Sequence, residues 1–158
     1  MYRFLIIFTL FIAFIHTPAL SQQPVTDSLL LLTADHKPLN TASLRGKVLF
    51  FNFWATSCIP CKEEMPDINN LYLHFKDSSN IAFLSIDVDG NSAAFMKAHN
   101  YTIPVYTIDG PVPPTWFRGV LPATVVITRS GQLAVSVDGR DNYEHYIGYL
   151  NLLRAYTN

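Results

Sequence analysis

The central part of the chain alternates long apolar runs with polar, turn-forming residues. Residues 48–53 (VLFFNF), 81–88 (IAFLSIDV) and 123–128 (ATVVIT) are nearly continuous apolar runs, which is typical of strands buried in the middle of a sheet. Three shorter runs predict further strands at 29–32, 105–108 and 133–137. The turn residues 129–132 join the last two strands as a hairpin.

Helical spacing of apolar residues predicts a helix over 63–75, directly after the first long run. A short helix over 93–99 and a closing helix over 143–156 complete the pattern. Strands that alternate with helices, followed by a hairpin and a last helix, predict an α/β sandwich with a mixed sheet. No repeat or low-complexity tract divides residues 22–158, so we expect them to form one domain.

The first 21 residues differ in kind from the rest. Arg3 precedes an apolar run at 4–15, and Ala19 and Ser21 fit the small positions of an export-signal cleavage site. The run is shorter than the roughly 20 residues that a membrane-spanning helix needs. We therefore expect a cleaved signal peptide over 1–21 and an exported protein, periplasmic or otherwise extracytoplasmic. An uncleaved signal that tethers the chain to the membrane is the alternative.

The charge of the chain identifies no partner. Eleven basic and twelve acidic residues give a formal net charge of −1, and the basic residues form no run. We therefore expect no nucleic-acid partner. We also expect a monomer.

The only two cysteines, Cys58 and Cys61, lie between the strand predicted at 48–53 and a helix. A cysteine at the start of a helix meets unpaired backbone N–H groups and the positive end of the helix dipole, and both favour its thiolate. The second cysteine lies one turn further on, within reach of a mixed disulfide formed at the first. Pro60 between them suits the first helical turn, where no backbone N–H is needed. The spacing favours a redox pair.

A metal site or a structural staple fits the cysteine pair less well. A structural zinc site needs two more ligands, and the chain has no third cysteine and no suitably spaced pair of histidines, so we expect no metal. A purely structural disulfide would close a loop too short to stabilise the fold by much.

The segment NFWATSCIPCKEEMP, residues 52–66, resembles the active site of the thioredoxin superfamily, and most closely that of the exported TlpA/ResA-like thiol–disulfide oxidoreductases. LRGKV (44–48) is similar to the family's lead into its central strand, and GVLPATVVITRSGQL (119–133) to its cis-proline loop and hairpin. The resemblance implies a thioredoxin-like three-layer sandwich, in which helices flank a central mixed β-sheet, and no cofactor.

The resemblance also implies three catalytic residues. Cys58 corresponds to the nucleophile and Cys61 to the resolving cysteine, and the two alternate between a dithiol and a disulfide. Glu64 lies three residues after Cys61, on the same side of the helix, and corresponds to a glutamate that moves the proton of the buried cysteine. The alternative for Glu64 is an ordinary first-turn acid that favours the helix dipole.

Substrate binding is expected at the cis-proline loop and beside the cysteines. Pro122 corresponds to the cis-proline that lies against the disulfide, and the backbone of Leu121 to the edge that pairs with an extended substrate. Trp54 corresponds to the tryptophan usual before the active-site turn, where it packs as much as it binds. Pro60, between the cysteines, completes the expected set.

Some positions depart from the superfamily or stand out locally. Asn52 replaces the buried aspartate of cytoplasmic thioredoxins, and because an amide cannot shuttle a proton, the base must be Glu64 or water. Ser57 replaces a tryptophan often found before the first cysteine, so no substrate specificity is carried over. Trp116 and Phe117 either form an apolar substrate lip or pack a short helix against the sheet.

By resemblance the pair reduces disulfides of exported proteins, and a thiol donor in the membrane restores the dithiol. The haem-site cysteines of apocytochrome c, and hence cytochrome c biogenesis, are a candidate substrate. The same site could instead insert disulfides, since the reduction potential sets the direction. A peroxidase is disfavoured because Thr56 lies only two residues before Cys58. A non-catalytic binding or copper-handling module, with His145 as a metal ligand, remains the alternative from another class.

Overall fold

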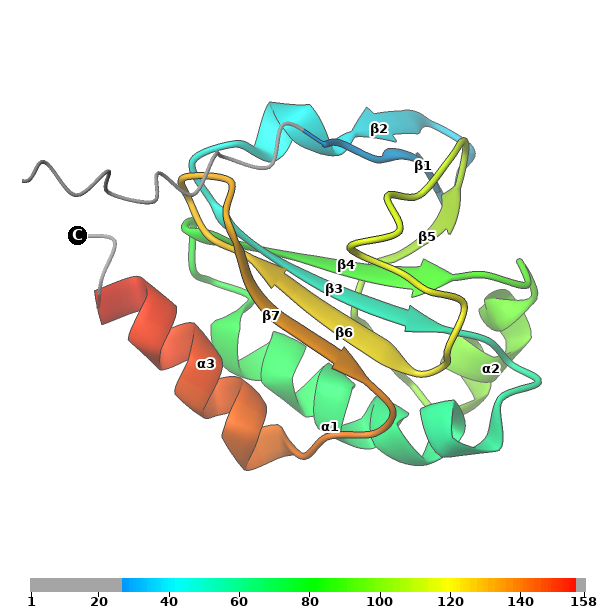
Figure 1. Ribbon diagram of the computed structural model, residues 1–158. Helices are drawn as coiled ribbons and strands as arrows, with labels where there is room; N and C mark the ends of the chain where they lie inside the picture. The colour runs from blue at the N-terminus through cyan, green and yellow to red at the C-terminus, as the bar shows by residue number, and fades with distance from the viewer. Residues whose placement is uncertain (1–26, 156–158) are drawn as a thin grey trace, which may run out of the picture.

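A computed structural model of the chain describes residues 27–155, which form one mixed sheet with helices packed against it (Figure 1). The predicted signal peptide lies outside the described residues. The seven strands follow the order β2-β1-β5-β4-β3-β6-β7 across the sheet. The elements are β1 (Leu30–Thr33), β2 (Pro38–Asn40), the 3-10 helix η1 (Thr41–Leu44), β3 (Val48–Trp54), α1 (Ile59–Phe75), β4 (Ile81–Asp87), α2 (Ser92–Ala98), β5 (Val105–Ile108), β6 (Ala123–Ile127), β7 (Leu133–Asp138) and α3 (Tyr143–Ala155).

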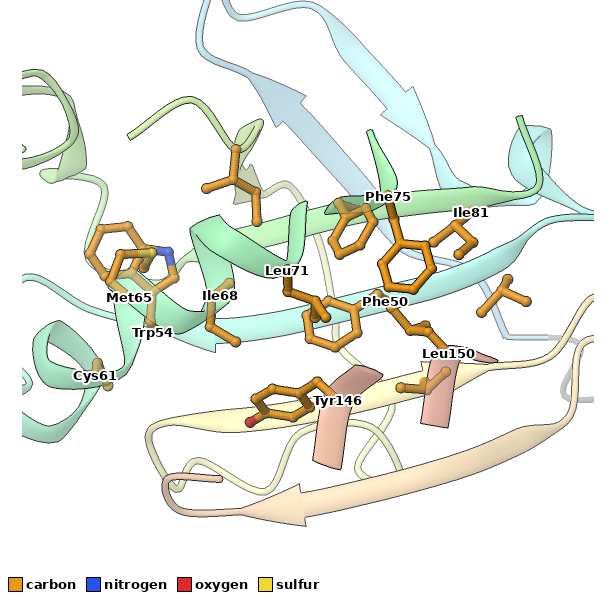
Figure 2. Close-up of a cluster of buried hydrophobic side chains, with 14 of the residues drawn as sticks. Phe50, Trp54, Cys61, Met65, Ile68, Leu71, Phe75, Ile81, Tyr146 and Leu150 are labelled. Carbon is orange, nitrogen blue, oxygen red and sulfur yellow. The ribbon is translucent and has the colours of Figure 1, made fainter. Parts of the chain in front are cut away.

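The central strand β3 is buried along its whole length, between a parallel partner, β4, and an antiparallel partner, β6. Because side chains alternate between the two faces of a strand, β3 contributes to two separate hydrophobic clusters. Phe50 and Trp54 pack with side chains of α1 and α3, as Figure 2 shows. Phe51 and Phe53 belong to the cluster on the opposite face.

The two faces of the sheet are covered in different ways. Helices α1 and α3 lie side by side over one face (Figure 1). The segment between β5 and β6 covers the other, where Trp116 packs on Phe51 at 5.1 Å between ring centroids and Phe117 stacks on Phe53 at 4.8 Å. Trp116 and Phe117 therefore pack against the sheet, and the short helix expected there is only a turn. The predicted thioredoxin-like α/β architecture is confirmed.

Two features differ from the sequence-based prediction. The sequence predicts only a turn at 35–38, but Pro38 opens the short strand β2 at the edge of the sheet. Proline is tolerated at the first residue of an edge strand, and three exposed or half-buried residues carry no apolar signal. Helix α1 begins at Ile59, as the placement of Pro60 in a first helical turn implied, whereas apolar spacing alone predicted the helix only from residue 63 because Ile59 and Pro60 are exposed.

No helix within residues 27–155 is both long and apolar enough to cross a membrane.

Candidate active site

The two cysteines form a disulfide at the junction of β3 and α1. Cys58 is the N-cap of α1 and has extended backbone angles, and Pro60 lies in the first turn. Cys61, one turn into the helix, is bonded to Cys58 and donates its backbone N–H to the Cys58 Sγ at 3.2 Å. The start of a helix stabilises negative charge, and so does an N–H directed at the sulfur. The geometry therefore favours a thiolate at Cys58 when the pair is reduced.

The two sulfurs differ in their access to solvent. Cys58 is half-buried at the surface, whereas Cys61 is only 1% exposed and lies in the hydrophobic cluster beneath α1. Figure 2 shows Cys61 at one end of that cluster. An incoming protein can therefore reach Cys58 directly but cannot reach Cys61.

The sheet topology brings the cis-proline loop to the end of β3 from which the active-site turn leaves. Strand β6 runs antiparallel to β3 with Ala123 opposite Phe53, so the residues before Ala123 meet the active-site turn where β3 ends. The Leu121–Pro122 peptide bond is cis, as the sequence predicted. Leu121 packs against the same cluster as the two cysteines, and the Pro122 carbonyl accepts the N–H of Gly139 at 2.7 Å.

The other two expected substrate-binding residues differ in exposure. Pro60 is exposed, next to Cys58 and the exposed Ile59. Trp54 has no exposed surface and packs against Phe95 of α2 at 5.6 Å between ring centroids. A substrate cannot touch a side chain that is completely covered, so the expectation of direct contact at Trp54 is corrected: it packs beneath the active-site turn.

Glu64 is buried, with 1% of its surface exposed, one turn after Cys61 on α1. Its Oε1 accepts the Tyr146 hydroxyl at 2.5 Å and the backbone N–H of Asp141 at 3.3 Å. Its Oε2 is also buried and has no hydrogen-bond partner among residues 27–155. Burial raises the pKa of Glu64 above its ordinary value, although both hydrogen bonds act in the opposite direction. Such a carboxyl can accept and release a proton closer to neutral pH.

Tyr146, which holds Glu64, and Thr124, which contacts Tyr146, were not predicted as site residues. Tyr146 comes from α3, 82 residues away in sequence, and its hydroxyl also lies 3.1 Å from the Thr124 hydroxyl of β6. Only the aromatic pattern of 143–156 hinted that a tyrosine faces the core, and nothing in that pattern indicated its partner.

Asp89, after β4, is a third residue that sequence reasoning missed. Its carboxylate accepts hydrogen bonds from the N–H and the hydroxyl of both Thr56 and Ser57, the two residues before Cys58. Burial acts to raise the pKa of Asp89, but the interaction with the neighbouring Asp87 side chain and the hydrogen bonds from Thr56 and Ser57 outweigh it and lower the pKa to about 2. Asp89 is therefore ionised at neutral pH and fixes the loop that leads to the nucleophile.

No group of three or more His, Cys, Asp or Glu side chains within the described residues is arranged to hold a metal ion. His145, the residue considered as a copper ligand, is exposed and pairs with Asp141 at 2.7 Å.

A thioredoxin-like sheet with a Cys-x-x-Cys disulfide at a helix start, and a cis-proline directly before the strand that pairs with β3, defines a thiol–disulfide oxidoreductase. The chain belongs to the AhpC/TSA family, whose sequence profile matches residues 22–111.

Two curated relatives are similar to most of the chain. It is 32% identical over 118 residues to the thiol-disulfide oxidoreductase ResA of Bacillus cereus, an alignment that covers 72% of this chain and 68% of the relative. It is 33% identical over 122 residues to ResA of Bacillus subtilis (strain 168), with 75% and 68% covered.

A solved structure agrees with these relatives. A thiol:disulfide interchange protein of the thioredoxin family from Chlorobium tepidum TLS superposes with a TM-score of 0.69 at 27% identity, over 82% of this chain and 94% of that one. The protein is therefore a thiol–disulfide oxidoreductase of the ResA type, with Cys58 and Cys61 as its cysteine pair.

Proposed function

We propose that this protein is exported and reduces disulfide bonds of other exported proteins with a Cys58/Cys61 dithiol. The unequal access to the two sulfurs carries the proposal, because it gives them different tasks: Cys58 meets the substrate and Cys61 stays sheltered until a mixed disulfide has formed. The signal-like composition of residues 1–21 supports export.

In the first step the Cys58 thiolate attacks one sulfur of the substrate disulfide. A bond forms between Cys58 and that sulfur, the substrate disulfide breaks, and the second substrate sulfur leaves as a thiolate and takes up a proton. The Cys61 N–H and the start of α1 stabilise the attacking thiolate.

In the second step Cys61 gives its proton to Glu64 and attacks the Cys58 sulfur. The Cys58–Cys61 disulfide forms, and the first substrate sulfur leaves as a thiolate. Two electrons have then passed from the protein to the substrate. Glu64 can take the proton because it is buried one turn from Cys61 and its pKa is raised.

The substrate is an extended segment containing a cystine, which lies along the Leu121 backbone against Pro122. Pro60 and Ile59, both exposed, provide an apolar edge beside Cys58. The haem-site cysteines of apocytochrome c are the substrate that we propose. A membrane thiol donor then reduces the Cys58–Cys61 disulfide. We propose that it acts as a monomer.

The proposal is tested by trapping the mixed disulfide. A Cys61→Ala variant of the full chain, produced in an exporting bacterium, cannot resolve the adduct and is expected to accumulate mixed disulfides through Cys58. Alkylation of free thiols followed by non-reducing electrophoresis and mass spectrometry would identify the partners, with peptides of c-type cytochromes among them.

The matched control is the Cys58→Ala/Cys61→Ala double variant, which should form no adducts. The proposal would be overturned if the double variant formed as many mixed disulfides as Cys61→Ala, or if Cys61→Ala formed none. Either result would favour a binding module. Trapped partners that carry reduced cysteines before the reaction and disulfides after it would make the protein an oxidant.

A further inference from the structure

The Glu64 carboxyl is held by a chain of hydroxyl groups that reaches the cis-proline loop. Thr124 lies two residues after Pro122 on β6, and its hydroxyl is 3.1 Å from the Tyr146 hydroxyl. The Tyr146 O–H donates to Glu64, so the Thr124 O–H is left to donate to the Tyr146 oxygen. The chain of contacts thus links the substrate loop to the acid beside Cys61.

We propose that Tyr146 is a positioning residue for Glu64, which holds the carboxyl in the orientation needed to exchange a proton with Cys61. This inference rests on the role proposed above for Glu64. The hydrogen bonds from Tyr146 and from the Asp141 N–H both end on Oε1. Oε2 has no partner among the described residues, so it is the oxygen left to carry the exchanged proton.

Tyr146 is built to be a permanent donor rather than an acid. The whole residue is buried, and its ring meets Phe50 edge-on at 5.5 Å between centroids (Figure 2). Burial and the neighbouring Glu64 raise the pKa of Tyr146 far above its ordinary value, so the phenol keeps its proton at any working pH. A donor that never titrates stabilises the Glu64 carboxylate without taking part in the proton transfer.

The environment of Glu64 contains few other charges. Arg140 lowers its pKa and Asp141 raises it, and neither effect is as large as that of burial or of the Tyr146 hydrogen bond. The titratable and charged groups that act on Glu64 are Tyr146, Asp141 and Arg140, of which Asp141 is paired with His145 and Arg140 with Glu63. Cys61 precedes Glu64 by three residues on α1, and both are buried.

Tyr146→Phe removes the hydroxyl and keeps the packed ring. The full chain, labelled with carbon-13 at glutamate and reduced, would be titrated by NMR at the Glu64 side-chain carboxyl. Because a donor to a charged group is lost, the Glu64 midpoint should move up by about one pH unit. The pH profile of insulin disulfide reduction, with dithiothreitol as the donor, should move in the same direction. Tyr149→Phe, a half-buried position on the same helix, should move neither.

Two further variants separate positioning from a structural role. Thr124→Val removes the donor to Tyr146 and should move the Glu64 midpoint up by a smaller amount. This variant tests the inference even if Tyr146→Phe does not fold. In a Glu64→Gln background, Tyr146→Phe should leave the pH profile of insulin reduction unchanged.

An unchanged Glu64 midpoint in Tyr146→Phe overturns the inference. An equal shift of the Glu64 midpoint in Tyr149→Phe also overturns it. So does a Tyr146→Phe change in the pH profile of insulin reduction that is undiminished in the Glu64→Gln background. A wild-type protein that does not reduce insulin would instead count against the proposed function, and the Glu64 titration would still decide whether Tyr146 holds the carboxyl.

Discussion

The carboxylate of Asp89 accepts the backbone N–H of Thr56 at 3.1 Å and its hydroxyl at 2.9 Å, across 33 residues of sequence. The parallel pairing of β3 with β4 explains this contact. Trp54 lies opposite Asp87 at the carboxyl ends of the two strands, so the loops that follow leave the same edge of the sheet. The loop that carries Cys58 is thereby fixed by a residue of the loop that follows the neighbouring strand β4.

Asp89→Ala should therefore destabilise the protein at neutral pH and slow the reaction of Cys58. The loss in free energy of unfolding should be about 1 kcal/mol, since the hydrogen bonds are exposed to solvent. The pKa of Asp89 is lowered from 3.8 to about 2, so its stabilisation is present above pH 3.8 and disappears as the pH falls through 2. Urea unfolding at several pH values measures the difference.

Asp77→Ala, at an exposed acid beyond the end of α1, is the control for the loss of one negative charge. A difference between wild type and Asp89→Ala that persists unchanged below pH 2 would mean that the Asp89 carboxylate is not what stabilises the loop.

Sequence reasoning identified the elements of this fold wherever apolar runs or helical spacing were strong. The strand at 105–108 and the start of β6 at Ala123 match the prediction. The cysteine pair and the cis-proline were identified because both depend on short local motifs. Asp89 and Tyr146 were missed because their partners are set by strand pairing and helix packing, which no local pattern encodes.

Asn52 and Asn69 are both buried but differ in their hydrogen bonds. Asn69 Oδ1 accepts two backbone N–H groups, those of Thr102 and Ile103, whereas the Asn52 amide has no partner among the described residues. A buried polar group without a partner costs about 1–3 kcal/mol. Asn52→Val should therefore increase the free energy of unfolding by about 1 kcal/mol, and Asn69→Leu should decrease it by about 2 kcal/mol.

Thermal and urea unfolding of both asparagine variants would measure these changes. A loss of stability in Asn52→Val as large as that in Asn69→Leu would show that the Asn52 amide makes favourable hydrogen bonds after all.

Glu64 should make stability depend on pH in the sense opposite to Asp89. Burial raises its pKa above the ordinary 4.5, so the fold favours the neutral carboxyl. The stabilisation that Glu64 gives the folded state is therefore fully present below pH 4.5, and it is lost as the pH rises through the raised pKa. The glutamine of Glu64→Gln stays neutral at every pH. Above pH 4.5 the free energy of unfolding of this variant should therefore rise relative to that of the wild type, by about 1.4 kcal/mol for each unit by which the pKa of Glu64 is raised.

Glu63→Gln is the matched control, because Glu63 is exposed on the preceding position of the helix. The urea midpoints of the two variants and the wild type would be compared at a series of pH values from about pH 4 upwards, to about pH 9. A stability difference between wild type and Glu64→Gln that does not change over this range would contradict a raised pKa at Glu64.

The reduction potential of the Cys58–Cys61 pair tests the central claim, that the protein is a reductant, most directly. The full chain would be equilibrated against dithiothreitol or glutathione buffers, and the fraction of dithiol determined by alkylation and mass spectrometry. We expect a value near or below that of thioredoxin, about −270 mV. A value near that of DsbA, about −120 mV, would contradict the account and make the protein a donor of disulfides.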